Sequence, residues 1–444
     1  MGPMLLAFSV ANYRTFRDEV TLDLTRRSLR TLTPRDGETW EGLTWRVAAV
    51  YGANASGKST LLDALQSFSA AVGGHRDILH QPYLLDEQHP VAPTTYTLDF
   101  TRGSQRYRYF VEAHGWGIAH EELWEAERRW KRLFLRTQDR DDPEPTVVPG
   151  PSLRGATAEV RRITTSKDLF LALALRYRHA SLAPVARSLR SIRPIQHTDI
   201  ERDARLSWLT EHLAEETAGA TQWHDVVDAV AHSADLGILR VELEERDIPH
   251  ELLARIRLLF TSDDEEPPEI PDELLRQLQH SLVFVHRGTD GKEYRLPLEA
   301  QSQGTLTWLA TMGPAADALS HGHLLLVDEL DASLHPTAVA SLVELFKDTD
   351  LNRHGAQLVF TTHDASLLGN SPTQPLERGE VWLCEKDDDG SADLYSVADF
   401  TGPRQGTNKE RQYLAGAFGA VPRVDTSSLR HALTAPSLYR EVEG

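Results

Sequence analysis

Residues 52–60 read GANASGKST and directly follow the apolar run VAAVY at residues 47–51. The stretch fits the pattern of a glycine, four residues, a second glycine, a lysine and a serine. Apolar side chains then recur at helical spacing, at Leu61, Leu65, Phe68 and Val72. A buried strand, a glycine-rich loop and a helix in this order predict a phosphate-binding loop in an α/β fold.

The residue types of this loop suit the binding of a nucleoside triphosphate. Gly52 and Gly57 let the backbone turn sharply and approach an anion, so that N–H groups point at phosphate oxygens. The start of the following helix adds its partial positive charge. The lysine would reach the terminal phosphates, and the serine hydroxyl would ligate Mg²⁺. The expected ATP-binding residues are Asn54, Ala55, Ser56, Gly57, Lys58, Ser59 and Thr60, with Lys58 also catalytic and Ser59 also a metal ligand.

Composition limits the function classes. The chain has 444 residues and a formal net charge of −19, which argues against nonspecific coating of DNA. The charge is uneven, because residues 126–195 hold 15 Lys and Arg against 7 Asp and Glu. No apolar run approaches the roughly 18 residues that a membrane span needs, so we expect a cytoplasmic protein. The one cysteine, Cys384, has no partner for an internal disulfide, and we expect it to be buried on a strand.

The order of strand and helix patterns predicts one nucleotide-binding domain in two halves. Strand patterns occur in residues 1–138 and again in residues 281–444, with mostly helical spacing between them. We therefore expect residues 139–280 to be a mainly helical insertion, and the strands around it to form a mixed or parallel sheet. The predicted strands are an N-terminal hairpin within residues 6–24 and segments at residues 96–100, 107–111, 282–286, 324–327, 358–362, 381–384 and 394–397.

The second strong motif is LLLVDELDASLHP at residues 324–336. Its four apolar residues place Asp328 and Glu329 at the carboxyl end of a buried strand, where ligands bind in open α/β sheets. Asp328 would hold Mg²⁺, and Glu329 would orient or deprotonate the attacking water as a catalytic residue.

Two weaker motifs accompany these. Ser302, Gly304 and Thr305 lie at the expected start of a helix, where hydroxyl and backbone donors face an anion. His363 follows the next strand, 35 residues beyond Asp328. It would donate a hydrogen bond to the γ-phosphate or help to place the water, as a further catalytic residue.

These four motifs in this order resemble the ATP-binding-cassette ATPases of the SMC and RecF type. The sequence is more similar still to the bacterial AAA-family ATPases of the RloA and AbiL abortive-infection group, near the OLD family. The similarity rests on FSVANYRTFRDEVTLDL, YGANASGKSTLL, QSQGT, VDELDASLHP, VFTTHDASLL and the tail RQYLAGAFGAVP. It implies an ABC-type P-loop NTPase head, with a mixed sheet flanked by helices, that uses ATP and Mg²⁺.

The resemblance also implies roles for further residues. Ser302 and Gly304 of one subunit would close over ATP held by another, giving a homodimer or a higher even oligomer that hydrolysis releases. Asp331 would act in the D-loop between the two sites, and Gln81 is the candidate for a glutamine that faces Mg²⁺. The residues expected near the nucleotide in the first hairpin are Asn12, Arg14 and Thr15.

The same resemblance implies a role in bacterial anti-phage defence. No nuclease motif is evident in the sequence, and Asp387, Asp388 and Asp389 fit a hairpin turn better than a metal site. A separate nuclease-like effector protein is therefore the expected partner that the ATPase regulates.

Two alternatives stay open from the sequence. The basic segment RRWKRLFLR at residues 128–136 interleaves aromatic and cationic side chains, which suits nucleic-acid contact, but it equally fits a strand with one basic face. The first alternative is thus a RecF-like or SMC-like ATPase acting directly on DNA in repair or recombination. The second is a scaffold that binds ATP without turnover, and the adjacent Asp328 and Glu329 speak against it.

Overall fold

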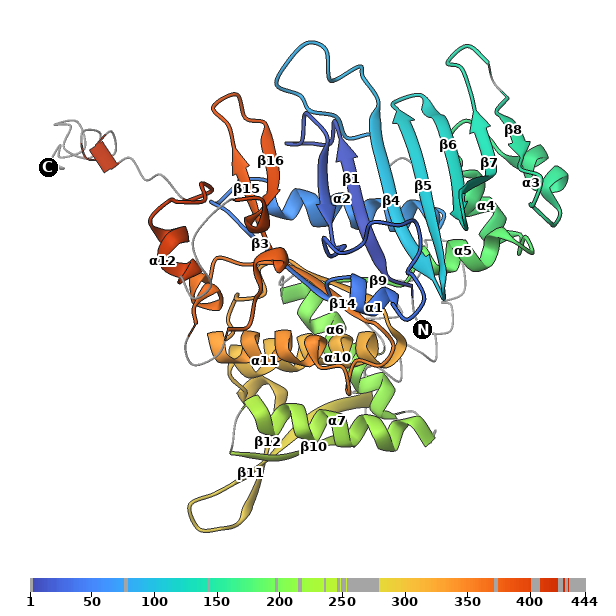
Figure 1. Cartoon of the computed structure of the whole chain (residues 1–444). Helices are drawn as coiled ribbons and strands as arrows, with labels where there is room; N and C mark the ends of the chain where they lie inside the picture. The colour runs from blue at the N-terminus through green and yellow to red at the C-terminus, as the bar shows by residue number, and fades with distance from the viewer. Residues whose placement is uncertain are drawn as a thin grey trace, which may run out of the picture.

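The computed structural model describes residues 3–75, 79–142, 144–195, 199–214, 218–234, 237–245, 279–370, 374–400 and 408–421, with residues 248, 253, 426, 427 and 430. In this part of the chain, three β-sheets and the helices around them make up the molecule (Figure 1). A six-stranded sheet lies centrally, between a seven-stranded sheet and a three-stranded sheet.

The central sheet gathers strands from distant parts of the chain. They are β3 (Val47–Tyr51), β9 (Ile192–Ile195), β13 (Leu324–Val327), β14 (Gln357–Thr361), β15 (Val381–Lys386) and β16 (Ala392–Ser396). Their order is β16-β15-β3-β14-β13-β9, with all neighbours parallel except β15 and β16. The carboxyl ends of the five parallel strands therefore lie at one edge of the sheet.

Both faces of this sheet are buried, as parallel strands require. Alternate residues of β3 enter different cores: Ala48 and Val50 belong to one, and Val47 and Ala49 to the other. The first face is covered by α2 (Lys58–Val72), and the second by α10 (Gln303–His321) and α11 (Pro336–Lys347). The P-loop helix and the helix that begins after Ser302 thus lie on opposite faces.

The seven-stranded sheet is antiparallel throughout, in the order β2-β1-β4-β5-β6-β7-β8. Its strands are β1 (Leu5–Ala11), β2 (Val20–Asp23), β4 (Thr94–Arg102), β5 (Gln105–His114), β6 (Gly117–Ala126), β7 (Trp130–Thr137) and β8 (Thr146–Pro149). On α2, Phe68 packs its ring against Phe8 of β1 and Tyr96 of β4. The P-loop helix is therefore held between two sheets.

The other elements surround these layers. The three-stranded sheet consists of β10 (Ile238–Glu245), β11 (His280–Arg287) and β12 (Glu293–Pro297), and α6 (Asp199–Ala214) and α7 (Ala218–Ala234) pack against α10. The remaining helices are α1 (Trp40–Leu43), α3 (Thr157–Ile163), α4 (Phe170–Arg176), α5 (Leu182–Leu189) and α12 (Lys409–Leu414), with 3₁₀ turns η1 (Leu298–Ala300), η2 (Ala365–Leu368), η3 (Arg378–Glu380) and η4 (Val397–Asp399). Among the helices that the structure describes, none combines the length and apolarity that crossing a bilayer needs.

Most predicted strands are confirmed. The N-terminal hairpin forms with Phe8 opposite Leu22. The segments predicted from residue 96 onward correspond to β4, β5, β11, β13, β14, β15 and β16. Residues 387–391 make the predicted hairpin turn, in which Asp389 accepts hydrogen bonds from Ser391. The predicted α/β class, a mixed sheet flanked by helices, is confirmed as well.

The region predicted as a mainly helical insertion contains the helices α3 to α7, but it also contributes a strand to each of the three sheets. Its strand β8 extends the seven-stranded sheet, β9 forms an edge of the central sheet beside β13, and β10 pairs with β11. The sequence of β9, IRPI, carries neither an apolar run nor an alternation, because proline and arginine interrupt it. The strands of this region thus pair with strands from the rest of the chain, while most of its described residues are helical.

Candidate functional site

The backbone of the loop between β3 and α2 is sharply curved. Gly52 (φ 154°), Ala55 (φ 61°) and Gly57 (φ 109°) all have positive φ, which favours a concave row of N–H groups. A Cβ at position 52 would lie 2.2 Å from the carbonyl oxygen of Cys384, so only glycine fits there. Helix α2 begins at Lys58, so the positive end of its dipole closes the loop.

Some side chains of the loop are exposed to solvent, and others are buried. Asn54, Ala55 and Ser59 are exposed, and Ser56 is buried. Lys58 is 6% exposed, and its ammonium donates hydrogen bonds to the carbonyls of Gly52 (3.0 Å) and Ala53 (2.9 Å). Burial lowers the pKa of Lys58, while the carboxylates of the site act in the opposite direction. The lysine is thus held across the loop, where phosphates would bind.

The two strongest motifs meet at the end of β13. Ser59 donates from Oγ to Oδ1 of Asp328 over 3.0 Å. Thr361, at the end of β14, donates from Oγ1 to the same carboxylate oxygen over 2.6 Å. Since β3, β14 and β13 are parallel neighbours, their carboxyl ends bring these three side chains together. A hydroxyl and a carboxylate are the oxygen donors that Mg²⁺ prefers, so these residues fit that ion.

Glu329 has an unusual backbone. It adopts φ 51°, a left-handed conformation that is uncommon for residues other than glycine and that occurs often at functional sites. Its N–H donates to Oγ1 of Thr361 over 2.7 Å, and its side chain is exposed. The predicted catalytic carboxylate therefore projects from the strand end on a fixed backbone.

The D-loop and the segment around His363 are joined through the backbone. The N–H of His363 donates to both carboxylate oxygens of Asp331, at 3.2 and 3.3 Å. The His363 side chain is exposed. The sequence predicted that His363 contacts the γ-phosphate, and the resemblance placed Asp331 between two nucleotide sites; the hydrogen bond between these residues was not predicted.

The predicted signature residues form a capped helix start. Ser302 caps α10, because its Oγ accepts from the N–H of Thr305 over 3.1 Å. A Cβ on Gly304 would lie 3.2 Å from the carbonyl oxygen of Ser333 in the D-loop segment. Ser302 is exposed and faces solvent. The position of these residues over a second copy's nucleotide stays a prediction.

Asn12 is buried, and its side-chain amide forms hydrogen bonds within the protein. It is 4% exposed, and its Nδ2 donates to the carbonyls of His89 (2.9 Å), Ala92 (3.1 Å) and Pro93 (3.1 Å). Its Oδ1 accepts from the N–H of Tyr83 over 2.9 Å. The side-chain amide thus fixes the segment before β4, and direct contact with ATP stays a prediction.

Arg14, Thr15 and Gln81 lie around the start of α2. Arg14 donates from Nε to Oε1 of Gln81 over 2.8 Å and forms an ion pair with Asp63 of α2. Thr15 donates to Thr60 Oγ1 over 3.4 Å. Gln81 is therefore connected to the P-loop helix through Arg14, and its role at the metal stays a prediction.

Cys384 supports the P-loop from β15. It is buried on that strand, as predicted, and its Sγ donates to the carbonyl of Ser56 over 3.0 Å. Burial raises the pKa of the thiol to about 12. The contact with the loop was missed because it depends on β15 lying beside β3, an order that the sequence does not give.

The basic segment belongs to β7, which confirms the strand interpretation. Arg136 is 0% exposed, and its guanidinium donates to the Thr165 carbonyl (3.1 Å) and to Oε1 of Gln138 (3.0 Å). This arginine is thus unavailable for nucleic acid. Arg128 and Arg129 precede the strand and are exposed, and Lys131 and Arg132 are partly exposed. Nucleic-acid contact through these residues stays a prediction.

The chain was compared with known protein families, solved structures and curated sequences. Residues 47–369 match the family described as "AAA domain, putative AbiEii toxin, Type IV TA system". Among solved structures, the chain is similar to the SMC head bound to the C-winged helix domain of ScpA, with 12% identity and a TM-score of 0.45 over 88% of this chain and 97% of that one. The SMC head domain from Thermotoga maritima gives 12% identity and a TM-score of 0.42 over 88% and 98% of the two chains. The SMC head domain with an extended coiled coil, bound to the C-terminal domain of ScpA derived from Pyrococcus furiosus, gives 12% and 0.43 over 89% and 96%. No curated protein sequence matches significantly.

Proposed function

This chain belongs to the AAA-domain family that matches it over residues 47–369, a family of P-loop ATPases, and we propose that it hydrolyses ATP between two copies of itself to control a separate effector protein. The observation that carries the proposal is the contact between Ser59 and Asp328, 3.0 Å apart at the mouth of the P-loop. It supports a site in which a phosphate loop and a metal-holding carboxylate act on one ligand.

In this proposal, the P-loop binds ATP. The N–H groups of residues 54–60 would surround the β- and γ-phosphates, and Lys58 would exchange its carbonyl contacts for phosphate oxygens. Ser59 and Asp328 would hold Mg²⁺, which neutralises charge on the phosphates when it is bound.

Hydrolysis to ADP and phosphate requires a positioned water. Glu329 would orient that water in line with the γ-phosphate and accept one of its protons. Its backbone is fixed for this by Thr361, which also holds Asp328. His363 would donate a hydrogen bond to the γ-phosphate.

The dimer is assigned to the start of α10. Ser302 is exposed at the positive end of a 19-residue helix, on the face of the sheet opposite to α2. A helix start with an exposed serine suits the γ-phosphate held by another copy. ATP would then join two heads, and hydrolysis would release them, so that the oligomer has an even number of chains.

The effector is proposed to be a nuclease-like protein in anti-phage defence. The family description names a toxin and a toxin–antitoxin system, which supports control of a harmful activity. Direct action on DNA, as in a RecF-like repair ATPase, is the competing outcome.

Glu329→Gln tests the enzymatic part. The glutamine keeps the shape but cannot accept the proton, so turnover should fall by about 10²- to 10⁴-fold while ATP binding is retained. The variant should accumulate as an ATP-bound dimer in mass photometry, and Lys58→Ala, which loses the phosphate contact, should stay monomeric. Hydrolysis by Glu329→Gln at the wild-type rate would refute the assignment.

The same trapped variant tests the effector. A pull-down from the native host should recover a nuclease-like protein with Glu329→Gln and ATP, but not with Lys58→Ala. Recovery of DNA and recombination proteins alone would replace the defence proposal with the repair function.

A further inference from the structure

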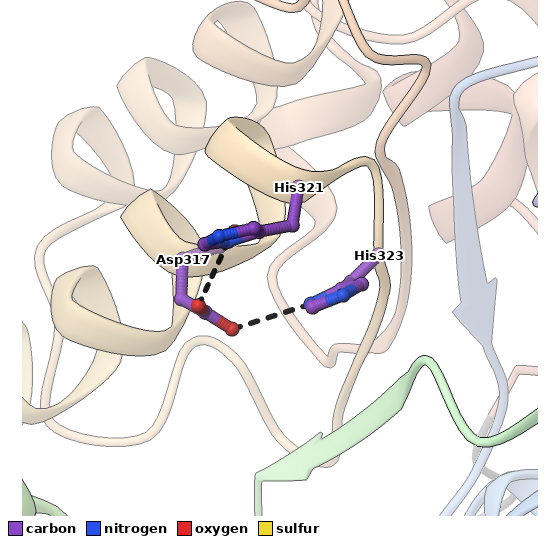
Figure 2. Close-up of side chains that lie close together, drawn as sticks. All are labelled: Asp317, His321 and His323. Carbon is purple, nitrogen blue, oxygen red and sulfur yellow. Dashed lines mark hydrogen bonds and ion pairs between the residues drawn. The ribbon is translucent and has the colours of Figure 1, made fainter. Parts of the chain in front are cut away.

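A cluster of three metal-ligating side chains lies far from the P-loop in the chain, at the end of α10. Figure 2 shows Asp317, His321 and His323 turned toward one another. Oδ1 of Asp317 lies 3.0 Å from Nδ1 of His321, and Oδ2 lies 3.2 Å from Nδ1 of His323. In the described part of the chain, this is the group of His, Cys, Asp or Glu side chains whose ligand atoms all lie within 4.8 Å of one another.

The spacing of these atoms matches a small tetrahedral ion. At metal–ligand distances of about 2.0–2.1 Å, two ligands of a tetrahedral zinc ion lie about 3.3 Å apart. The two measured separations, 3.0 and 3.2 Å, are close to that edge. The two imidazole rings are nearly parallel, with 16° between their planes and 5.3 Å between their centroids. Each ring places its Nδ1 beside a different oxygen of the Asp317 carboxylate.

We propose that Asp317, His321 and His323 bind a divalent transition-metal ion of the zinc class. Two imidazole nitrogens and one carboxylate oxygen are a donor set of this class, and they differ from the all-oxygen set that Mg²⁺ prefers. The fourth position would be taken by water, because the His321 side chain is 61% exposed.

The surroundings support an oriented carboxylate. Arg193 of β9 donates from Nε to Oδ2 of Asp317 over 3.5 Å. Arg193 thus helps to orient this carboxylate, as outer-shell partners of metal ligands do.

The position of the cluster gives the ion a structural task. Asp317 and His321 belong to the last turns of α10, and His323 directly precedes β13. A bound ion would tie the end of the helix that starts after Ser302 to the strand that ends before Asp328. It would therefore stiffen the connection between these two elements.

The test uses the untagged full chain, treated with a chelator and free of nucleotide. Zn²⁺ titration by calorimetry should give one ion per chain, and Co²⁺ should give the visible absorption of a tetrahedral site. His321→Ala, His323→Ala and Asp317→Asn should each weaken Zn²⁺ binding by at least about tenfold, since even outer-shell changes have effects of that size. The matched control is His354→Ala, because His354 is exposed in a turn outside the cluster.

Thermal unfolding provides a second measurement. Zn²⁺ should raise the midpoint of the wild type and of His354→Ala, and leave the cluster variants unchanged. His321→Ala keeps the test decisive, because an exposed side chain is removed without opening the core. Equal Zn²⁺ stoichiometry in the wild type and in the double variant His321→Ala/His323→Ala would overturn the proposal.

Discussion

Thr361→Val is expected to damage both stability and turnover, because one hydroxyl contacts both the carboxylate of Asp328 and the backbone N–H of Glu329. Thr361 is fully buried, donates to Asp328 over 2.6 Å and accepts from the N–H of Glu329 over 2.7 Å. Valine has nearly the same shape, so the change removes these two hydrogen bonds without opening a cavity.

The expected loss of stability follows from the two groups that lose a hydrogen-bond partner, the carboxylate of Asp328 and the N–H of Glu329. A hydrogen bond to a charged group contributes about 1.5–3 kcal/mol, and a buried N–H left unpaired costs about 1–3 kcal/mol. Water at the open strand end replaces part of this loss, so we expect the free energy of unfolding to fall by about 2–4 kcal/mol. Displacement of the catalytic carboxylate should lower kcat by about 10- to 100-fold, or about 1.4–2.7 kcal/mol of barrier.

Urea unfolding and steady-state ATP hydrolysis measure the two effects. Thr361→Ser keeps the hydroxyl and should retain most of the activity. Thr362→Val is the matched control, because Thr362 is also buried but its hydroxyl accepts only from the N–H of Asp364, over 3.0 Å, among the contacts described. A Thr361→Val protein with wild-type kcat would refute the shared role of this hydroxyl.

Three further changes probe the loop, the helix start and the thiol. Gly57→Ala should abolish binding of a fluorescent ATP analogue, because φ 109° strains any side chain and the new Cβ would lie 3.0 Å from Thr15 Oγ1; wild-type affinity would contradict this. Ser302→Arg should leave ATP binding by the monomer intact but prevent the ATP-dependent dimer in mass photometry, and a normal dimer would contradict the proposed interface. Cys384 should resist iodoacetamide at pH 8 in the native protein, since its pKa is raised to about 12 and only the thiolate reacts. In urea the pKa returns to about 8.5 and the thiol should react readily, as mass spectrometry would show.

The contact between Ser59 and Asp328 could be predicted from the sequence because strand ends converge. An apolar strand followed by acidic residues, and a P-loop after another strand, belong to one edge whenever both strands lie in a parallel sheet. Ser59 and Asp328 meet as that argument requires. No distance along the sequence enters this argument, so a separation of 269 residues did not weaken the prediction.

The contacts that the sequence could not provide depend on the order of strands. Thr361 reaches Asp328 because β14 is the neighbour of β13, and Cys384 reaches the P-loop because β15 is the neighbour of β3. Arg136 was placed on a basic face by its residue type, but the structure buries it among backbone carbonyls. None of these three contacts leaves a pattern in the local sequence, since all of them arise from long-range packing.

The position of β3 between β14 and β15 also determines when the P-loop can acquire its shape during synthesis. Leu358 of β14 pairs with Val47, and Val381 of β15 pairs with Ala49. The strand that precedes the P-loop therefore cannot pair until the ribosome has synthesised residues more than 300 positions further along the chain. Chains with such distant pairings fold slowly and expose unpaired apolar strands meanwhile. A ribosome-bound fragment that ends before β14 should therefore be a chaperone client without nucleotide affinity, and ATP binding should appear only when almost the whole polypeptide has emerged.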